Sequence, residues 1–451
     1  MTEQVDVVVV GMGPGGEAVG ADLAAAGLSV VGIEANLVGG ECPYYACIPS
    51  KMMIRAANSL AEARRVHELA GSATAKPDFR PVAERIRAEA TTDWDDQTAV
   101  DRFEEAGGRF VRGRAQVTGP NTVRVGDQEL TASRAIVLNT GTDPAVPPIP
   151  GLADSPFWTN REAIAAETAP ESLIVLGGGP VGAELAQAFV RFGSRVDVVE
   201  MADRLLPSDE PESSRLLTEV FTREGIGVHT GVAAERIDHD GAGFTVDVGG
   251  NQLSAERLLV ATGRQIDLAG LGLASIGLDT DRKFVEPDPQ LRIADSVYAV
   301  GDITGKGAFT HMSMYQAHIV TRHILGDHDV AAEYHAVPRV TFTDPEIGAV
   351  GLTEVQAREQ GPAVAVAVAQ VPSSARGWIH KAGNDGFIKL VADTDQGILV
   401  GATSAGPHGG EVLSMLTLAV HERTPISRLK EMIYAYPTFH RAVEDALSQL
   451  P

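Results

Sequence analysis

The two cysteines of this 451-residue chain lie close together in the sequence, at Cys42 and Cys47. Five residues of regular helix rise about 7.5 Å, more than a disulfide tolerates, so a bridge between them requires an irregular turn. Pro43 and Pro49 favour such a turn. A structural zinc site needs four ligands, and the chain has no further cysteine, so we expect no metal. The alternative is two inert buried thiols, which the glycines before the pair and Lys51 after it disfavour.

The composition of the chain limits which partners and which cellular compartment we expect for this cysteine pair. The net charge is −23 and the pI about 4.9, which disfavours nucleic acid and anionic membrane surfaces as partners. No signal segment is visible at the N-terminus, and apolar runs such as 7–10 are too short to cross a membrane. With two cysteines only, we expect a cytoplasmic protein, in which a cysteine pair is more often catalytic or metal-binding than structural.

An internal duplication is the strongest feature of the sequence. Each copy reads strand, glycine turn, helix, strand and acid, and the acid lies 23 positions after the first glycine. Such a turn places a pyrophosphate at the N-terminus of a helix, and the acid accepts the hydroxyls of a ribose. The sequence therefore predicts two dinucleotide sites. The glycines and acids are Gly11, Gly13, Gly16 and Glu34 in the first copy, and Gly177, Gly179, Gly182 and Glu200 in the second.

The remaining pattern predicts an α/β protein with two Rossmann-like FAD/NAD(P)-binding domains and an α+β C-terminal domain. Strands are expected at 340–342, 349–352, 387–391 and 398–404, and helices at 411–422 and 438–450. The predicted boundaries are 1–150 for the FAD-binding domain, 151–275 for the NAD(P)-binding domain, 276–333 for a part that completes the FAD domain, and 334–451 for the dimerisation domain.

In the order of these motifs, the chain resembles the pyridine nucleotide–disulfide oxidoreductase family, which includes dihydrolipoamide dehydrogenase, glutathione reductase and mercuric reductase. The two glycine motifs, the cysteine segment, Gly301-Asp302 and the segment 337–346 all fall where the family has them. The resemblance implies FAD in the first copy, a nicotinamide dinucleotide in the second, and a homodimer in which the partner completes each active site. Glu200 favours NADH over NADPH, because a carboxylate repels a 2′-phosphate, and only Arg204 is near enough in sequence to compensate.

The resemblance also implies residue roles. Cys47 faces the flavin as the charge-transfer thiol, Cys42 exchanges with substrate, and Lys51 pairs with Glu184 near flavin N5. Asp302 binds the ribityl chain, and Ala115 lies near the adenine. The FAD residues that it implies are Gly11, Gly13, Gly16, Glu34, Gly40, Glu41, Lys51, Ala115, Thr140, Gly141, Gly301 and Asp302. The dinucleotide residues of the second site are Gly177, Gly179, Gly182, Glu200 and Gly263.

One departure from the family bears on the acceptor. Thiol-exchanging members carry a His-Pro-Thr segment followed by a glutamate, the acid–base pair for the thiol, whereas here Tyr436 and Arg441 stand at those positions. His440 is close enough in sequence to be a substitute base, or is simply a histidine at the start of a helix. Glu41 replaces a usual threonine and Ala46 a usual glycine.

We therefore expect an NAD(P)H-dependent flavoenzyme that reduces a small acceptor such as a disulfide or a quinone. A flavin-dependent dithiol oxidase that uses oxygen is a second interpretation, and a non-enzymatic redox-sensing flavoprotein is a third. Turnover of NADH with an added acceptor separates the first from the other two, and oxygen uptake with a dithiol identifies the second.

Overall fold

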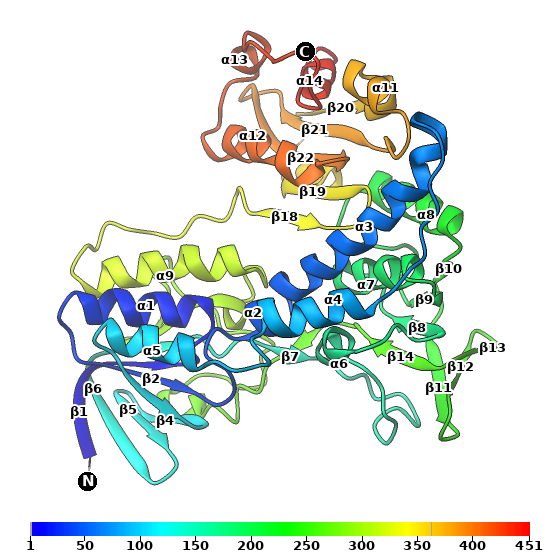
Figure 1. Ribbon diagram of the computed structural model, residues 1–451. Coiled ribbons are helices and arrows are strands. Elements are labelled where there is room, and N and C mark those ends of the chain that lie inside the picture. Colours follow the sequence, from blue (N-terminus) through cyan, green and yellow to red (C-terminus); the bar gives the residue numbers. More distant parts are fainter. Residues whose placement is uncertain (1, 362) are drawn as a thin grey trace. The chain divides into compact units, whose positions relative to one another are not determined.

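The computed structural model describes residues 2–361 and 363–451 (Figure 1). The chain forms two compact units, each assembled from three stretches of sequence. The first unit contains residues 1–49, 85–144 and 264–334, and the second contains residues 50–84, 145–263 and 335–451. This division into two units does not test the four domain ranges expected from the sequence, which stay a prediction.

The first unit is built on one mostly parallel sheet, in the strand order β16-β17-β6-β1-β2-β3. The central strand β1 carries four consecutive buried valines, Val7–Val10, because both faces of a parallel sheet are covered. Helices α1, α5 and α9 contribute to the core on one face. The strands are β1 (Thr2–Val10), β2 (Val30–Glu34), β3 (Arg109–Arg112), β4 (Ala115–Gly119), β5 (Thr122–Val125), β6 (Gln128–Leu138), β7 (Asp143–Pro144), β15 (Arg264–Gln265), β16 (Arg292–Ala294) and β17 (Val297–Ala299). The helices are α1 (Pro14–Ala25), α2 (Glu41–Tyr44), α5 (Gln97–Glu105) and α9 (Thr310–Ile324), with a short 3-10 turn η3 (Gly301–Thr304).

The second unit contains the other glycine turn, in a four-stranded parallel sheet of order β10-β9-β8-β14. Its elements include β8 (Ser172–Leu176), α7 (Pro180–Arg191), β9 (Arg195–Glu200), α8 (Pro211–Glu224), β10 (Gly227–Thr230) and β14 (Arg257–Val260). A three-stranded antiparallel sheet of β11 (Ala234–His239), β12 (Phe244–Val248) and β13 (Asn251–Ala255) belongs to the same unit. Most of α3 (Cys47–Leu69), α4 (Arg80–Arg85) and α6 (Asn160–Ala165) also lie in it.

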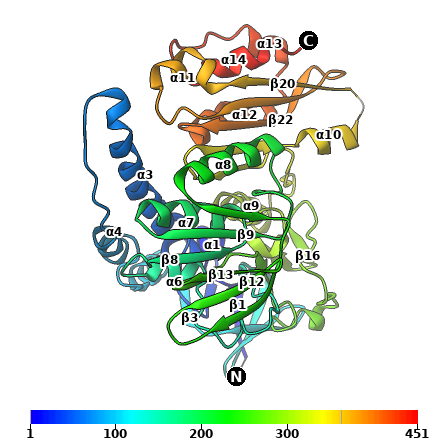
Figure 2. The ribbon, with the colours of Figure 1, turned by 90° about the vertical axis from the view of Figure 1, so that its right-hand side faces the viewer.

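The C-terminal part of the second unit is an antiparallel sheet of order β18-β19-β22-β21-β20, against which α12 and α14 pack (Figure 2). The strands are β18 (Pro338–Thr341), β19 (Glu346–Gly351), β20 (Val364–Gln370), β21 (Phe387–Asp393) and β22 (Ile398–Gly406). The helices are α10 (Glu354–Gln360), α11 (Ala375–His380), α12 (Gly409–His421), α13 (Ile426–Lys430) and α14 (Arg441–Leu447).

In this part the sequence patterns did not predict β20, α10, α11 or α13, and they placed the start of α14 too early. Strand β20 has no polar alternation, since it reads Val-Ala-Val-Ala-Val-Ala-Gln, and it was not expected. The last helix was expected from Thr438, but α14 begins at Arg441, because residues after Pro437 form a turn first. Among the described residues, no helix is long and apolar enough to cross a membrane.

Candidate active site

The two predicted dinucleotide turns have the same hydrogen-bond geometry. In the first, the Glu34 carboxylate accepts from the backbone N–H groups of Met12, at 2.8 Å, and Asn36, at 2.7 Å. In the second, Glu200 accepts from the N–H groups of Gly178, at 2.6 Å, and Ala202, at 2.7 Å. Both acids therefore lie across the glycine turn at the end of the second strand, where the sequence analysis expected a ribose to bind.

Close backbone packing explains the glycines. At Gly11 (φ +91°) a Cβ would lie 2.3 Å from the carbonyl oxygen of Asn139, and at Gly177 (φ +106°) it would lie 2.3 Å from that of Ala261. The third glycine of each turn would place a Cβ 2.0 Å from the carbonyl oxygen of the first. By contrast, no atom lies within 4 Å of a Cβ built at Gly179. That open space leaves room for a phosphate to approach the backbone at the start of α7.

Asn139 is a positioning residue of the first turn that the sequence analysis did not single out. Its Oδ1 accepts from the N–H of Gly16 at 2.7 Å, and its Nδ2 donates to Val300 O at 2.8 Å and Ser313 Oγ at 3.1 Å. The side chain is buried and joins α1 to the ends of two strands. A polar residue directly after the buried run 135–138 was the available signal.

Asp302 lies at the end of the same sheet, beside a second residue that was missed. Thr142 Oγ1 donates to its carboxylate at 2.9 Å, and burial raises the pKa of Asp302 above its ordinary value. Arg264 bonds both the side chain and the carbonyl of Thr142, and lies 3.9 Å from Asp302 and 4.0 Å from Glu41. The unusual glutamate is therefore part of a charged cluster next to the predicted ribityl-binding residue.

The first unit offers a buried hydroxyl without a partner and closely packed glycines, which fit FAD. Thr140 Oγ1 is buried and has no hydrogen-bond partner among the residues described. Gly40 (φ +66°) lies so near Gly13 that a Cβ would be 3.0 Å from its Cα. Ala115 is buried at the start of β4. Gly141 and Gly301 follow the strand ends with positive φ, and Gly263 does so after β14 in the second unit.

The cysteines lie on either side of a helix break. Cys42 is in the short helix α2, and Cys47 is the first residue of α3, with Tyr45 between them in a non-helical conformation. Both cysteines are half-buried. Cys47 Sγ lies 3.3 Å from the hydroxyl of Thr310, the first residue of α9 and another residue that the sequence analysis missed. A hydroxyl at this distance can stabilise a thiolate by donating to it.

Lys51 and Glu184 come together as an ion pair. Lys51 Nζ lies 2.8 Å from Glu184 Oε2, and Glu184 Oε1 accepts from the backbone N–H of Phe342 at 2.9 Å. Lys51 Nζ also lies 4.7 Å from the centroid of the Phe342 ring, a cation–π contact. The Glu184 side chain is buried, whereas that of Lys51 is 36% exposed, so the ammonium can still approach a ligand.

Tyr436 and Arg441, the residues that depart from the family pattern, contact each other near the C-terminus. Tyr436 is 70% exposed, and the Arg441 guanidinium lies 5.5 Å from the centroid of its ring. Arg441 also pairs with Glu444 at 2.6 Å. His440 is half-buried at the N-terminal boundary of α14. The peptide bond between Tyr436 and Pro437 is cis.

Comparisons with known families agree with this geometry. Residues 5–317 match the family model described as pyridine nucleotide-disulphide oxidoreductase, and residues 337–447 match the dimerisation domain of that family. A dihydrolipoyl dehydrogenase of Halobacterium salinarum is 34% identical, over 98% of this chain and 95% of its own length. A mercuric reductase of Bacillus cereus is 30% identical, over 98% of this chain and 71% of its own length.

Solved structures give the same result. The HOCl-induced flavoprotein disulfide reductase RclA of Escherichia coli, in a Cu(II) complex, aligns over 100% of both chains with a TM-score of 0.88 and 26% identity. LpdA of Mycobacterium tuberculosis shares the fold, with a TM-score of 0.87 at 24% identity. With two dinucleotide turns and a dimerisation domain in the family's order, the chain belongs to the pyridine nucleotide–disulphide oxidoreductase family and is an FAD- and pyridine nucleotide-binding flavoprotein oxidoreductase.

Proposed function

We propose that this enzyme uses NADH to reduce a small acceptor through FAD, and that the Cys42–Cys47 pair carries the electrons onward when the acceptor is a disulfide. FAD, when bound, supplies the two-electron redox chemistry. Cys47 is the thiol that faces the flavin, and the hydroxyl of Thr310 3.3 Å away supports its thiolate. Cys42 is the thiol that reacts with the acceptor where the acceptor is a disulfide.

The proposal assigns the charged residues as follows. Glu34 holds the adenosine ribose of FAD, and Asp302 holds the ribityl chain. Lys51 lies near flavin N5, where its positive charge favours the anionic reduced flavin. Glu184 keeps that ammonium paired and oriented, which the 2.8 Å contact supports.

The proposed preference for NADH rests on the Glu200 carboxylate and on the hydrogen bonds that Arg204 makes. Arg204 was the one cation near enough in sequence to bind a 2′-phosphate. Its Nη2 donates instead to the carbonyl oxygens of Pro207, at 2.9 Å, and Asp209, at 3.1 Å. Because these carbonyl oxygens hold Nη2, we expect Arg204 to compensate only in part for the Glu200 carboxylate, and we expect a preference for NADH.

The acceptor class that we propose is supported by one observation, the exposed Tyr436 with Arg441 over its ring. Disulfide exchange needs a group that takes and returns a proton near neutral pH, as histidine does. Arginine cannot do so, and a tyrosine hydroxyl has a reference pKa of about 10. A quinone-type acceptor takes electrons directly from reduced flavin and needs no such base. We therefore infer that quinones are reduced faster than glutathione disulfide or lipoamide.

The test compares kcat/KM for a quinone and for these disulfides in the parent and in Tyr436→His. General acid–base help typically contributes about 10²- to 10⁴-fold, so restoring the histidine should raise disulfide turnover selectively. His440→Ala examines the substitute base, with His421→Ala as a control at an exposed histidine of the same domain. Efficient disulfide reduction by the parent that collapses only in His440→Ala would show that the base has moved, and would refute the acceptor proposal.

We also infer a homodimer, because residues 337–447 match the dimerisation domain of the family. Sedimentation or light scattering should give about twice the 47.4 kDa of one chain. A monomer that retains full acceptor turnover would refute this inference.

A further inference from the structure

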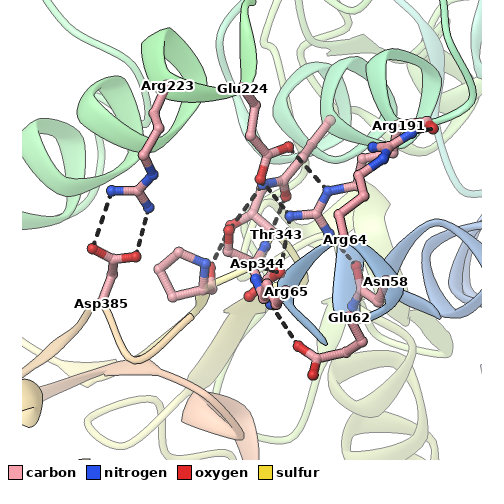
Figure 3. A network of polar contacts seen from close by, with 12 residues as sticks. Asn58, Glu62, Arg64, Arg65, Arg191, Arg223, Glu224, Thr343, Asp344 and Asp385 are labelled. Carbon is pink, nitrogen blue, oxygen red and sulfur yellow. Dashed lines mark hydrogen bonds and ion pairs between the residues drawn. The ribbon is translucent and has the colours of Figure 1, made fainter. Parts of the chain in front are cut away.

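Arg191, the last residue of α7, lies at the centre of a buried polar network (Figure 3). Its side chain is 2% exposed. The guanidinium donates to both carboxylate oxygens of Glu224, at 3.0 and 2.5 Å, to Asp344 Oδ2 at 2.9 Å, and to Asn58 Oδ1 at 2.6 Å. Every nitrogen of the guanidinium therefore has a partner, and the partners come from three different parts of the chain.

One face of α7 is joined to the segment 342–344 by a series of hydrogen bonds. Glu184, Gln187 and Arg191 are spaced by three and four residues, so they share this face. Glu184 accepts from Phe342 N at 2.9 Å. Gln187 accepts from Asp344 N at 2.7 Å and donates to Asp344 O at 2.8 Å, and Arg191 binds the Asp344 carboxylate. The backbone of the segment is thereby held along the helix that carries Glu184.

The helix that carries Lys51 is fixed to the same network. Besides Asn58, α3 contributes Arg65, whose Nη2 donates to Asp344 Oδ2 at 2.7 Å. Arg64 donates to the carbonyl oxygen of Arg191 at 2.8 Å. The network therefore joins the three elements that carry the contacts of Lys51: its own helix, the helix of Glu184, and the segment of Phe342.

We propose that Gln187 and Arg191 are positioning residues for the Lys51–Glu184–Phe342 group. Neither touches Lys51; they act by holding Glu184 and the Phe342 ring where the ammonium needs them. The inference rests on the proposed role of Lys51 beside the flavin. A long buried arginine with three acidic or amide partners is costly to desolvate, and the benefit that we infer here is a unique arrangement of the elements it joins.

Gln187→Met is the decisive variant, because it removes the hydrogen bonds of this side chain to Asp344 and to Glu224 Oε1 while keeping the length and the zero charge of the side chain. Arg191→Met removes the centre of the network, and Arg191→Lys keeps the charge. Arg223→Met is the matched control, since Arg223 pairs with Asp385 at 2.6 Å on the exposed part of α8 in the same region (Figure 3). Each holoenzyme is measured for the rate of flavin reduction by NADH and for the flavin midpoint potential, with thermal unfolding as a check of folding.

We expect Gln187→Met to slow flavin reduction by about 5- to 100-fold, the range over which small misplacement acts, and to lower the midpoint potential. Arg191→Met should do the same, Arg191→Lys should recover part of the loss, and Arg223→Met should match the parent. In a Lys51→Met background, Gln187→Met should have no further effect on either quantity.

Parental values in folded Gln187→Met, or an effect that persists undiminished in the Lys51→Met background, would overturn the inference. If Arg191→Met does not fold, Gln187→Met decides alone. Lys51→Met also separates the two proposals. If it leaves rate and potential unchanged, the role of Lys51 fails and the inference fails with it; if it changes both while Gln187→Met does not, only the inference fails.

Discussion

Replacing Glu200 by glutamine is the most direct test of coenzyme selection. The carboxylate accepts from Gly178 N and Ala202 N at the end of β9, and Arg204 is held by backbone carbonyls. Two unit charges 4 Å apart interact by about 1 kcal/mol in water and about 4 kcal/mol at an effective dielectric constant of 20. For a partly buried carboxylate near a phosphate we take about 2 kcal/mol, roughly 30-fold in kcat/KM.

Glu200→Gln should therefore raise kcat/KM for NADPH about 10- to 30-fold. The value for NADH should fall about fivefold, because a neutral hydrogen bond to the ribose is weaker than a charge-assisted one by about 1 kcal/mol. Initial rates are measured with both coenzymes at fixed ionic strength, with Asp203→Asn as a control for a nearby exposed acid. Tenfold preference of the parent for NADPH, or an equal gain in Asp203→Asn, would refute the reasoning.

Four further outcomes are expected. Gly16→Ala should weaken FAD binding at least about tenfold, because its Cβ would lie 2.0 Å from a backbone oxygen. Fluorescence titration of the apoprotein measures the affinity, and an unchanged affinity would contradict the proposed FAD-binding role of the first glycine turn. Cys42→Ser should keep bound flavin and show a long-wavelength charge-transfer band that Cys47→Ser lacks, and the same spectrum in both would contradict the thiol assignment. Burial raises the pKa of Asp302, so the apoprotein loses stability as pH rises and this carboxyl ionises. Asp302→Asn should therefore raise the unfolding free energy of the apoprotein at pH 7 but not below about pH 4, as measured by pH-dependent denaturation. Arg191→Met should cost about 3–5 kcal/mol of unfolding free energy, against less than about 1 kcal/mol for Arg223→Met at an exposed pair; equal losses in urea melts would contradict the burial argument.

The dinucleotide turns were predictable because their chemistry is local. A glycine with positive φ, a helix N-terminus and an acid at a set distance are all encoded within about 25 residues, and Glu34 and Glu200 lie where that spacing placed them. The family resemblance rested on these turns and on the order of further short motifs, namely the cysteine segment, Gly301-Asp302 and the segment 337–346, and both the fold class and the family were confirmed. The residue roles at the flavin and the cysteines stay predictions.

Other residues of the site depend on contacts between distant segments. Asn139 bonds Gly16 across 123 positions, and Cys47 meets Thr310 across 263, so no sequence period signals either contact. From the sequence, Arg204 was a candidate to bind the 2′-phosphate of NADPH. Only the folded loop shows that its Nη2 donates to backbone carbonyl oxygens.

By itself, the sequence determined the two dinucleotide folds, the cysteine pair and the missing histidine, because each depends on residue type and short spacing. Apart from the Lys51–Glu184 pair, which the family resemblance implied, only the tertiary structure decided which charges are paired. The Arg191 network illustrates the reason: whether an arginine is a surface charge or the buried centre of several elements depends on burial and on distant partners such as Asp344, and both arise only when the chain folds.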